Sequence, residues 1–230
     1  MTDMPDSTVS PTTRIILVRH GQSVANAGGI PPDHITNPLT ELGHTQAQAF
    51  ADGLPCTPTL FLHSPFLRTR QTAEPTLRRF PEVPVEQWPI HEFTFLEPSL
   101  HSGKSEEQQG PHIEDYWERG DPAYLAGPGA ESFTLFLDRA RDAIERLSRI
   151  TTGGCIVVFT HGLMMQAFRM LLLFPHATDA ELMSAFRRFH FSNFIKNTEP
   201  IELETADGHL RLVDQEHLTT FTLQGEASHA

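Results

Sequence analysis

The sequence predicts a three-layer α/β fold, in which an open and mostly parallel sheet is flanked by helices on both faces. Three observations predict it. Short apolar runs without polar alternation are typical of strands that are buried on both faces of a parallel sheet. Segments with helical hydrophobic spacing separate these runs, so strands and helices alternate along the chain. The length of 230 residues, 39% of them hydrophobic, suits one domain with a sizeable core, and we assign all of 1–230 to it.

The first strand and helix are expected after a flexible N-terminus over residues 1–13. Ile15–Val18 is a continuous apolar run that ends at polar residues, which predicts a buried strand. A helix is expected from Thr40, whose hydroxyl can cap its first turn, to Gly53, which can end it.

A second strand and helix follow directly. Leu60–Leu62 predicts the strand, and the helix after it is expected to reach about Phe80. Pro75 lacks an amide hydrogen and should kink this helix or end it early. Short extended pieces are expected at 83–85 and 88–90.

Residues 93–130 interrupt the alternation of strands and helices. The stretch is rich in Gly, Pro, Glu and Gln, yet it holds both tyrosines and Trp117, rings for which a linker has little use. We therefore expect a folded insertion of helix and loop that packs over another part of the protein. Long insertions of this kind are often lids, and plain packing of the rings is the alternative.

The rest of the chain resumes the alternation and ends in a hairpin. Phe133–Leu147 carries the strongest helical spacing, Ile156–Phe159 is the clearest strand, and Leu163–Phe174 reads as the next helix. Thr178 begins a capping-box signature for a further helix. Alternating apolar residues on both sides of Asp207-Gly208 predict a C-terminal hairpin.

Charge and hydropathy exclude several classes of partner. The sequence has 17 basic and 29 acidic residues, a formal net charge of −12, whereas nucleic acids and anionic membranes require a basic footprint. The N-terminus lacks the basic and apolar regions of a signal peptide, and no apolar run approaches the ~18 residues of a membrane span. We expect a cytoplasmic protein without a nucleic-acid or membrane partner.

The two cysteines, Cys56 and Cys155, are far apart in sequence and show neither a CxxC motif nor zinc-finger spacing. We expect two free thiols, as is usual in a reducing cytosol. One long-range disulfide is the alternative.

Three polar segments follow predicted strands and carry residues suited to phosphate. They are Arg19-His20-Gly21 with Asn26, then Ser64-Pro65 with Arg68, then Thr160-His161-Gly162. Ligands of open α/β sheets bind at the carboxyl ends of the strands, so these segments are expected at one edge. Guanidinium groups match the non-bridging oxygens of a phosphoryl group, and an imidazole can attack its phosphorus. Alone, a histidine after a strand is more often structural.

The order of these motifs resembles that of the histidine phosphatase superfamily, which includes the cofactor-dependent phosphoglycerate mutases. The resemblance spans positions 15 to about 170, and several ordered motifs are far more specific than one RHG tripeptide. The motifs are Arg19-His20-Gly21 with Ser23 and Asn26, Asn37-Pro38-Leu39-Thr40 with Gly43 and Gln46-Ala47, Ser64-Pro65 with Arg68 and Gln71-Thr72-Ala73, Glu131-Ser132-Phe133, and Thr160-His161-Gly162.

The resemblance implies a role for each matched residue. His20 would attack phosphorus and form a phosphohistidine, while Arg19, Arg68 and His161 would bind the equatorial oxygens. Asn26 would orient the phosphoryl group. The amides around Gly21, at a helix start, would add positive partial charge.

The family supplies a carboxyl group after the third strand as the proton donor. Glu92 fits that position, with Glu97 close by as the alternative. The same group, once ionised, would deprotonate the water that hydrolyses the phosphohistidine. The resemblance implies no metal and no cofactor.

The residues after Glu92 favour a phosphatase over a mutase. In the mutase branch this glutamate is followed by basic and polar residues that can hold a carboxylate, whereas here 93–96 reads Phe-Thr-Phe-Leu. The insertion adds only Lys104 and Arg119 as basic residues. We expect a metal-independent hydrolase of a small phosphomonoester with an apolar or weakly charged leaving group, a phosphoprotein substrate also being open. The alternatives are phosphoglycerate mutase-type transfer and a non-catalytic phosphate binder.

Overall fold

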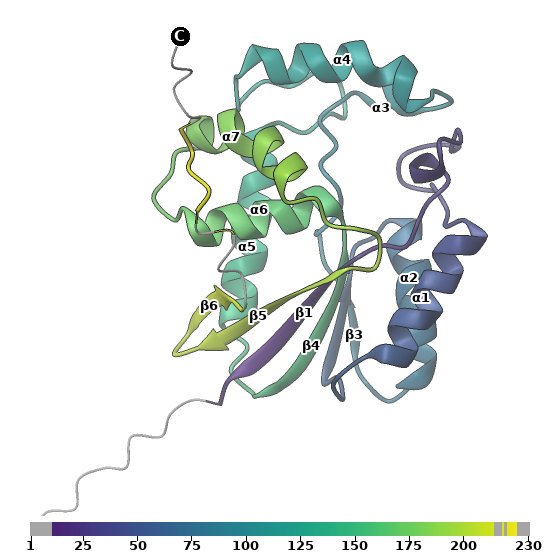
Figure 1. Cartoon of the computed structure of the whole chain (residues 1–230), viewed down its shortest axis with the longest axis vertical. Helices are drawn as coiled ribbons and strands as arrows, with labels where there is room; N and C mark the ends of the chain where they lie inside the picture. The colour runs from purple at the N-terminus through teal and green to yellow at the C-terminus, as the bar shows by residue number, and fades with distance from the viewer. Residues whose placement is uncertain (1–10, 214–217, 219, 225–230) are drawn as a thin grey trace, which may run out of the picture.

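The computed structural model describes residues 11–213, 218 and 220–224, and a sheet of the order β3-β2-β4-β1-β5-β6 lies at its centre (Figure 1). Strands β1 to β4 run parallel to one another, whereas β5 and β6 are antiparallel. The mostly parallel sheet and the C-terminal hairpin are therefore confirmed. The strands are β1 Thr13–Arg19, β2 Leu60–His63, β3 Val85–Gln87, β4 Gly154–Thr160, β5 Pro200–Ala206 and β6 His209–Leu212.

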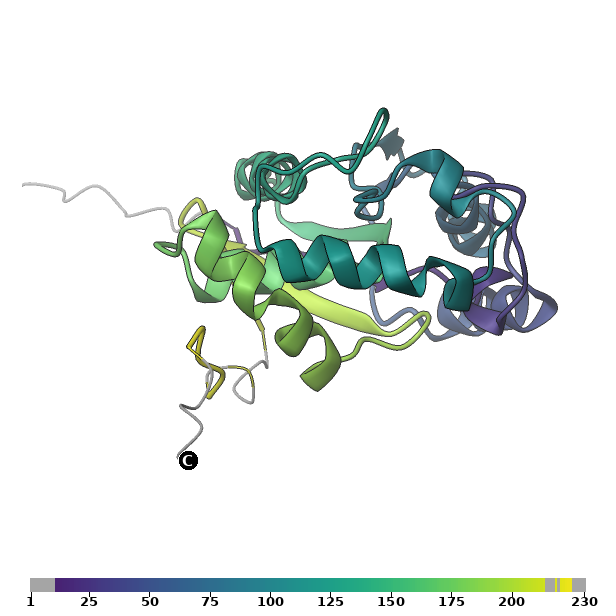
Figure 2. The same cartoon turned by 90° about the horizontal axis from the view of Figure 1, so that it is seen from above.

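Helices cover both faces of the sheet, as predicted (Figures 1 and 2). Two helices pack on one face, namely α1 Glu41–Gly53 and α2 Leu67–Arg79. Three lie on the other side, namely α5 Phe133–Ser148, α6 Gly162–Leu173 and α7 Asp179–Ser192. Thr40 caps α1 by accepting from the amide of Gly43, and Thr178 caps α7 in a capping box with Glu181.

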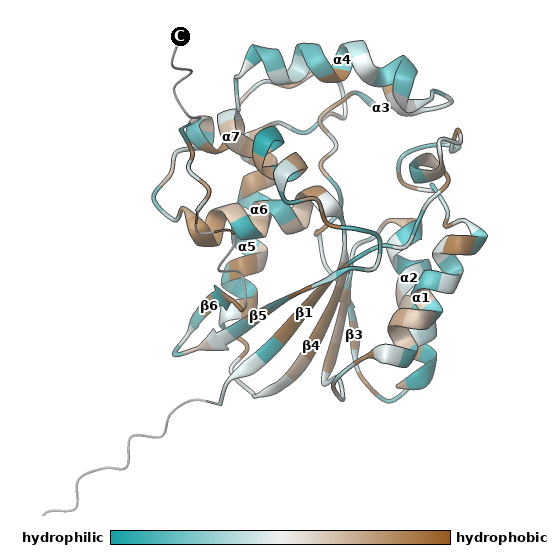
Figure 3. Cartoon of the chain, in the orientation of Figure 1, coloured by the Kyte–Doolittle hydropathy of each residue, from teal (hydrophilic) through white to brown (hydrophobic). Residues whose placement is uncertain are grey.

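Side chains of the central strands alternate between two cores. Ile15 and Leu17 pack toward α5 and α6, while Ile16 and Val18 pack toward α1 and α2, and all four are essentially unexposed. A strand buried on both faces has no polar side to alternate with, which explains the continuous apolar run. The same property colours much of β1 and β4 brown in Figure 3.

Two predicted boundaries were wrong, and the predicted end of the second helix was right. Thr13 already belongs to β1 and is fully buried, so the flexible segment expected over 1–13 does not extend to it, and residues 1–10 lie outside the described part of the chain. Helix α2 ends at Arg79, in agreement with the end predicted near Phe80, and it continues through Pro75, so Pro75 does not end it early. The third strand is β3, and 88–90 form no strand.

The insertion 93–130 is folded, as expected, and forms two helices beyond the carboxyl ends of the strands (Figures 1 and 2). They are α3 Pro98–His101 and α4 Glu106–Arg119. Aromatic rings attach the insertion to the helical layer: Phe93 stacks on Phe136 with centroids 4.5 Å apart, and Trp117 stacks on Phe186 at 5.9 Å. These contacts place α4 over the edge of the sheet where the polar motifs converge.

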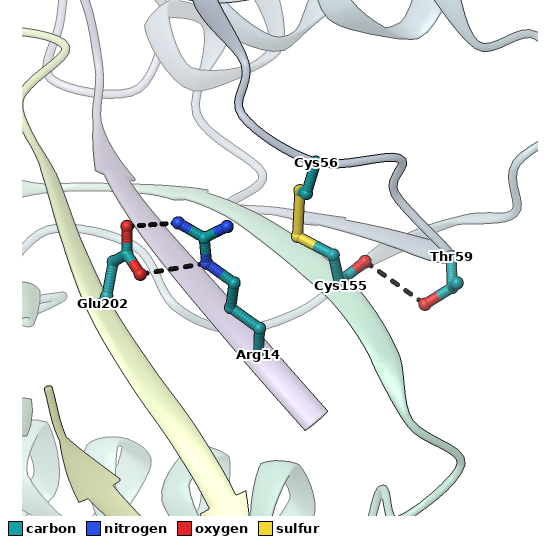
Figure 4. The surroundings of a disulfide bond; sticks show 5 residues. All are labelled: Arg14, Cys56, Thr59, Cys155 and Glu202. Atoms are coloured by element: carbon teal, nitrogen blue, oxygen red, sulfur yellow. Dashed lines mark hydrogen bonds and ion pairs between the residues drawn. A yellow bond between two sulfur atoms is a disulfide. The ribbon is translucent and has the colours of Figure 1, made fainter. Parts of the chain in front are cut away.

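The cysteines form a disulfide, so the expectation of two free thiols was wrong. Cys56, in the loop after α1, is bonded to Cys155 in β4, at the amino end of that strand (Figure 4). The side chain of Arg14 lies nearby and donates two hydrogen bonds to Glu202. Only the alternative of one long-range bridge was compatible with this result. Spacing alone could not reveal it, because the two segments meet only through the packing of the loop on the sheet.

In the described residues, no helix is long and apolar enough to cross a membrane.

Candidate active site

The two catalytic histidines expected from the sequence lie side by side at the end of adjacent strands. Arg19 of β1 is in register with Thr160 of β4, so the next residues, His20 and His161, emerge together. Their ring centroids are 5.2 Å apart. Parallel pairing of β1 and β4 thus joins two motifs that are remote in sequence.

Two arginines approach His20 from different elements. Arg68, in the first turn of α2, donates from Nε to His20 Nε2 at 3.2 Å and from Nη1 to the carbonyl of His34. Arg19, at the end of β1, donates from Nη1 to the carbonyl of Ile195 at 2.6 Å. Burial lowers the pKa of Arg68 to about 10, which leaves it charged at neutral pH. The pair forms a positive site in an acidic protein.

The protonation of His20 follows from its neighbours. Nδ1 lies 2.7 Å from the carbonyl oxygen of Gly21, and because a carbonyl can only accept, Nδ1 carries the hydrogen. The lone pair is therefore on Nε2, which faces Arg68. Burial, then the charges of Arg68 and Arg19, lower the pKa of His20 well below its ordinary value. The imidazole is neutral and nucleophilic at physiological pH.

His161 is oriented by a serine that the sequence argument did not assign. Ser64 Oγ lies 2.7 Å from His161 Nε2 and accepts from the amide of Phe66, and Ser64 and His161 are both fully buried. The hydroxyl can donate to Nε2 or accept from it, and when it donates, the imidazole hydrogen is on Nδ1. Nδ1 has no hydrogen-bond partner among the described residues. His161 is thus prepared to donate one hydrogen bond.

Glu92 is half-buried and lines the same cavity as the two arginines. Its Oε1 accepts from the amides of Phe93 at 3.2 Å and Leu163 at 3.1 Å, the second of these at the start of α6. Burial raises the pKa of Glu92, although both arginines and both amides oppose the shift. Because Oε1 holds the amides, Oε2 is the natural site for a proton.

The amide of Gly21 was expected at the start of a helix, where it would face the phosphoryl group, but it is hydrogen-bonded to a side chain instead. It donates to Thr72 Oγ1 at 3.0 Å, and no α-helix begins at Gly21, since the chain forms only the short 3-10 helix Ala25–Ala27. Glycine is required here for packing: a Cβ would lie 2.6 Å from the carbonyl oxygen of Gly43. The absence of a side chain at Gly21 lets α1 pack closely against the loop that follows His20.

Asn26 is held by an asparagine from the other end of the chain. Asn197 Nδ2 donates to the carbonyl of His20 at 2.9 Å and to Asn26 Oδ1 at 3.3 Å. The amide hydrogens of Asn26 are thereby directed away from Asn197. The adjacent Thr198 has a φ of 56°, a strained conformation for a β-branched residue, and its amide donates to the carbonyl of Arg19. This loop fastens the segment 194–199 to the end of β1.

A cavity of about 260 Å³ opens above these groups. It brings together five of the seven predicted site residues, namely Arg19, His20, Asn26, Arg68 and Glu92. Gly21 and His161 are not part of its lining. The apolar part of its wall comes from Phe93, Phe95 and Ile113 of the insertion, with Leu163 of α6. Glu97, the alternative proton donor, is not part of the lining.

Three further residues of this site were not predicted from the sequence. Ser64 and Thr72 lay within the quoted motifs, and their hydrogen bonds to His161 and Gly21 require the tertiary structure. Asn197 had no signal, because it belongs to the loop before β5 and meets Asn26 only in the folded chain. No group of three or more His, Cys, Asp or Glu side chains suited to a metal ion occurs within the described part of the chain.

Comparison with known proteins identifies relatives of this chain and of its fold. The family model described as "Histidine phosphatase superfamily (branch 1)" matches residues 15–216. A metal-independent phosphoserine phosphatase of Arabidopsis thaliana is 30% identical over 172 residues, which cover 69% of this chain and 68% of that protein. An adenosylcobalamin/alpha-ribazole phosphatase of Salmonella typhimurium is 25% identical over 175 residues, 72% of this chain and 82% of that protein.

Solved structures share the fold at lower identity. The alpha-ribazole phosphatase from Shigella flexneri superposes with a TM-score of 0.67 at 22% identity, covering 87% of this chain and 95% of that one. A phosphoglycerate mutase from Bacillus anthracis gives a TM-score of 0.68 at 18% identity, covering 90% and 94%. The predicted fold class is thus confirmed by known structures as well.

Proposed function

The chain belongs to the histidine phosphatase superfamily (branch 1), and on this premise we propose that it hydrolyses phosphomonoesters through a phosphohistidine on His20. One observation carries the proposal. His20 has its hydrogen on Nδ1, bound to the Gly21 carbonyl, and its lone pair on Nε2 beside two guanidinium groups in a cavity that also holds Glu92. A nucleophile, an oxyanion site and an acid are the three parts that the reaction needs.

In the first step His20 Nε2 attacks phosphorus, and the bond from phosphorus to the ester oxygen breaks. Arg68 leaves Nε2 and pairs with the phosphoryl oxygens together with Arg19, so their charges act where negative charge accumulates. His161 donates from Nδ1 to the same oxygens. Asn26 donates from its amide, which Asn197 holds in the required orientation.

Glu92 supplies the proton that the leaving alkoxide needs. Its raised pKa keeps the carboxyl protonated at a higher pH than an ordinary glutamate. Once the alcohol departs, the ionised Glu92 takes a proton from water, the hydroxide attacks the phosphohistidine, and inorganic phosphate and free His20 are released. The catalyst is thereby restored with no net change in its protons.

The wall of the cavity supports hydrolysis rather than transfer between positions of phosphoglycerate. Among the described residues, Arg19 and Arg68 are the only Lys or Arg side chains in its lining, and both are needed for the phosphoryl group. A carboxylate on the leaving group would find no further cation there. The wall of Phe93, Phe95 and Ile113 suits an apolar or weakly charged leaving group instead.

The relatives support the phosphatase class and differ in substrate. One is described as a phosphoserine phosphatase and another as acting on alpha-ribazole phosphate, so the class is shared and the leaving group is not. We propose a small phosphomonoester for this chain, with phosphoproteins as a second candidate class. Metal independence is proposed from the name of the phosphoserine phosphatase relative.

We propose that α4 acts as a lid. Gln109 and Ile113 of α4 face the catalytic cavity, while Glu114 pairs with Arg187 of α7 through two hydrogen bonds of 2.7 Å. The pairing can anchor one end of the helix while the other end moves. Hydrogen exchange of α4 with and without orthovanadate tests the idea: protection on binding is expected, and equal exchange would contradict it.

The cytoplasmic location expected from the sequence now has one observation against it. A disulfide such as Cys56–Cys155 normally persists in an oxidising compartment. Alkylation of the isolated protein with and without prior reduction, read by mass spectrometry, decides the matter. Two alkylated thiols before reduction would support the cytoplasm, and two protected thiols would favour an oxidising compartment.

The experiment that tests the function is hydrolysis of an aryl phosphate by the wild type and His20→Ala. The wild type should release phosphate and form an acid-labile phosphohistidine in a rapid quench, and His20→Ala should do neither. Equal activity of the two proteins would refute the assignment of the nucleophile. If both bind phosphate but neither hydrolyses any ester, the protein is a phosphate binder. Isomerisation of phosphoglycerate that outruns hydrolysis would make it a mutase.

A further inference from the structure

A second cavity, of about 390 Å³, adjoins the catalytic one and has no role in the mechanism above. It lies between the loop that carries His34, the start of α2, and the segment that leads from His91 into the insertion. His34 lines both cavities. His91 lines the second cavity, whereas its neighbour Glu92 lines the first, so the proton donor stands between the two spaces.

The walls of this second cavity are rings and apolar side chains. Phe66 packs against the His34 ring with centroids 5.3 Å apart and against His91 at the same distance. Leu96 and Pro98 complete the apolar lining. Phe66 also touches the catalytic pair, with its ring 5.2 Å from that of His161 and 5.0 Å from the Arg68 guanidinium. A ligand in this space would therefore rest against the scaffold of the catalytic groups.

The charge of the cavity excludes an anionic occupant. Within the described part of the chain, no lysine or arginine belongs to its lining, and its one carboxylate, Asp33, already accepts from the amides of Ile35 and Thr36. Burial lowers the pKa of His91 to about 4, so this imidazole is neutral at physiological pH. A flat, uncharged group matches these walls.

The volume of the second cavity also favours an organic ligand. Organic ligands usually occupy pockets of about 300 to 1,000 Å³ that are mostly apolar with a few polar groups. The catalytic cavity is smaller than this and must also take the phosphoryl group, whereas the second cavity falls within the range. The Nδ1 atom of His91 is buried without a hydrogen-bond partner in the described chain, which offers one polar contact.

We propose that this second cavity is the leaving-group subsite of the enzyme, and that it takes an uncharged aromatic ring of the phosphomonoester. The phosphoryl group would lie over His20 and the ester oxygen beside Glu92, while the ring passes His34 and rests on Phe66. The proposal rests on the phosphatase function and adds the class of leaving group. The competing arrangement places the ring on Ile113, within the catalytic cavity.

Binding of two stable phosphonates to the full chain tests this. Methylphosphonate probes the phosphoryl site alone, and 2-naphthylmethylphosphonate adds a ring, both measured by titration calorimetry. Thr94→Trp and Ser102→Trp fill the second cavity from two different segments. Ser99→Trp is the matched control, because Ser99 lies in α3 between the two substituted positions, is exposed and lines neither cavity. Ile113→Trp fills the competing position.

The wild type is expected to bind the naphthyl ligand at least about tenfold more tightly than methylphosphonate. Both cavity-filling variants should lose this preference and keep the wild-type affinity for methylphosphonate, which also shows that they are folded. Ser99→Trp should behave as the wild type.

Three results would overturn the proposal while leaving the phosphatase function intact. They are a wild type without preference for the ring, a preference abolished only by Ile113→Trp, and binding of free 2-naphthol that does not compete with the naphthyl phosphonate. Failure of the wild type both to bind methylphosphonate and to hydrolyse any ester would instead refute the proposed function, and this inference with it.

Discussion

Ser64→Ala should reduce catalysis without removing any group that touches the substrate. In the wild type the Ser64 hydroxyl lies 2.7 Å from His161 Nε2 in a site that is closed to water. Without it Nε2 is left buried and unpaired, and the ring is no longer confined to the tautomer with its hydrogen on Nδ1. A buried group left without its partner costs about 1–3 kcal/mol.

The expected effect on rate follows from that figure. If about 1–2 kcal/mol of it is lost from the transition state, kcat/KM for an aryl phosphate falls roughly 5- to 30-fold, since 1.36 kcal/mol is a factor of ten. The assay is steady-state phosphate release, combined with nitrogen NMR of the His161 ring, whose two nitrogens report the tautomer directly. The NMR signature separates a positioning role from simple loss of stability.

Thr69→Val is the matched control. Its hydroxyl is equally buried and donates to the carbonyls of Ser64 and Phe66, but does not touch His161. It should lower the free energy of unfolding by a similar 1–3 kcal/mol and leave the tautomer unchanged. The reasoning is refuted if Ser64→Ala retains wild-type kcat/KM and the same nitrogen spectrum.

Three further predictions concern the acid, the disulfide and a buried ion pair. Because burial raises the pKa of Glu92, the folded state binds this proton more tightly than the unfolded state does, so the carboxyl lowers the stability of the fold once the pH rises above its pKa in the unfolded chain. Glu92→Gln should therefore raise Tm at pH 7, and it should abolish the alkaline fall in kcat for esters of poor leaving groups. An unchanged Tm would contradict the burial argument. Reduction of Cys56–Cys155 should lower the free energy of unfolding by about 2–4 kcal/mol in denaturant titrations. It should leave kcat/KM unchanged, because the bond lies at the amino end of β4, away from the cavity. A drop in kcat/KM would contradict this separation. Arg139 donates two hydrogen bonds to Glu131 and two to carbonyl groups of the segment before Glu92. Arg139→Met should lower the free energy of unfolding in urea by about 3–5 kcal/mol and lower kcat most for esters of poor leaving groups. An equal loss of kcat for all leaving groups would contradict this.

Much of the fold could be predicted because its signals are local. Ile15–Val18 and Ile156–Phe159 lack polar alternation for the simple reason that both faces of these strands are buried, and Thr178 shows its capping role within four residues of sequence. The errors arose where a local rule competes with packing. Pro75 should interrupt a helix, yet α2 passes through it because its inner face is buried.

In the candidate site, too, the residues marked by local motifs could be predicted, whereas the contacts between them could not. Arg19, His20, Arg68 and His161 each follow a strand or begin a helix, so a sequence motif marks them, and the structure brings them together as expected. The contacts that tune them were not visible, because a hydrogen bond between side chains remote in sequence leaves no periodic trace.

The sequence by itself therefore determined the class of fold, which residues are predicted to act as nucleophile, cations and acid, and the apolar character of the residues after Glu92. Only the tertiary structure decided their protonation and their surroundings. Burial and the guanidinium charges lower the pKa of His20, Ser64 holds the His161 ring by a hydrogen bond, and Asn197 orients Asn26. The bond between Cys56 and Cys155 and the ring-lined cavity at Phe66 also exist only once distant segments pack together. Electrostatics and cavities depend on distances in space, and these are set by the whole packed chain rather than by any local run of residues.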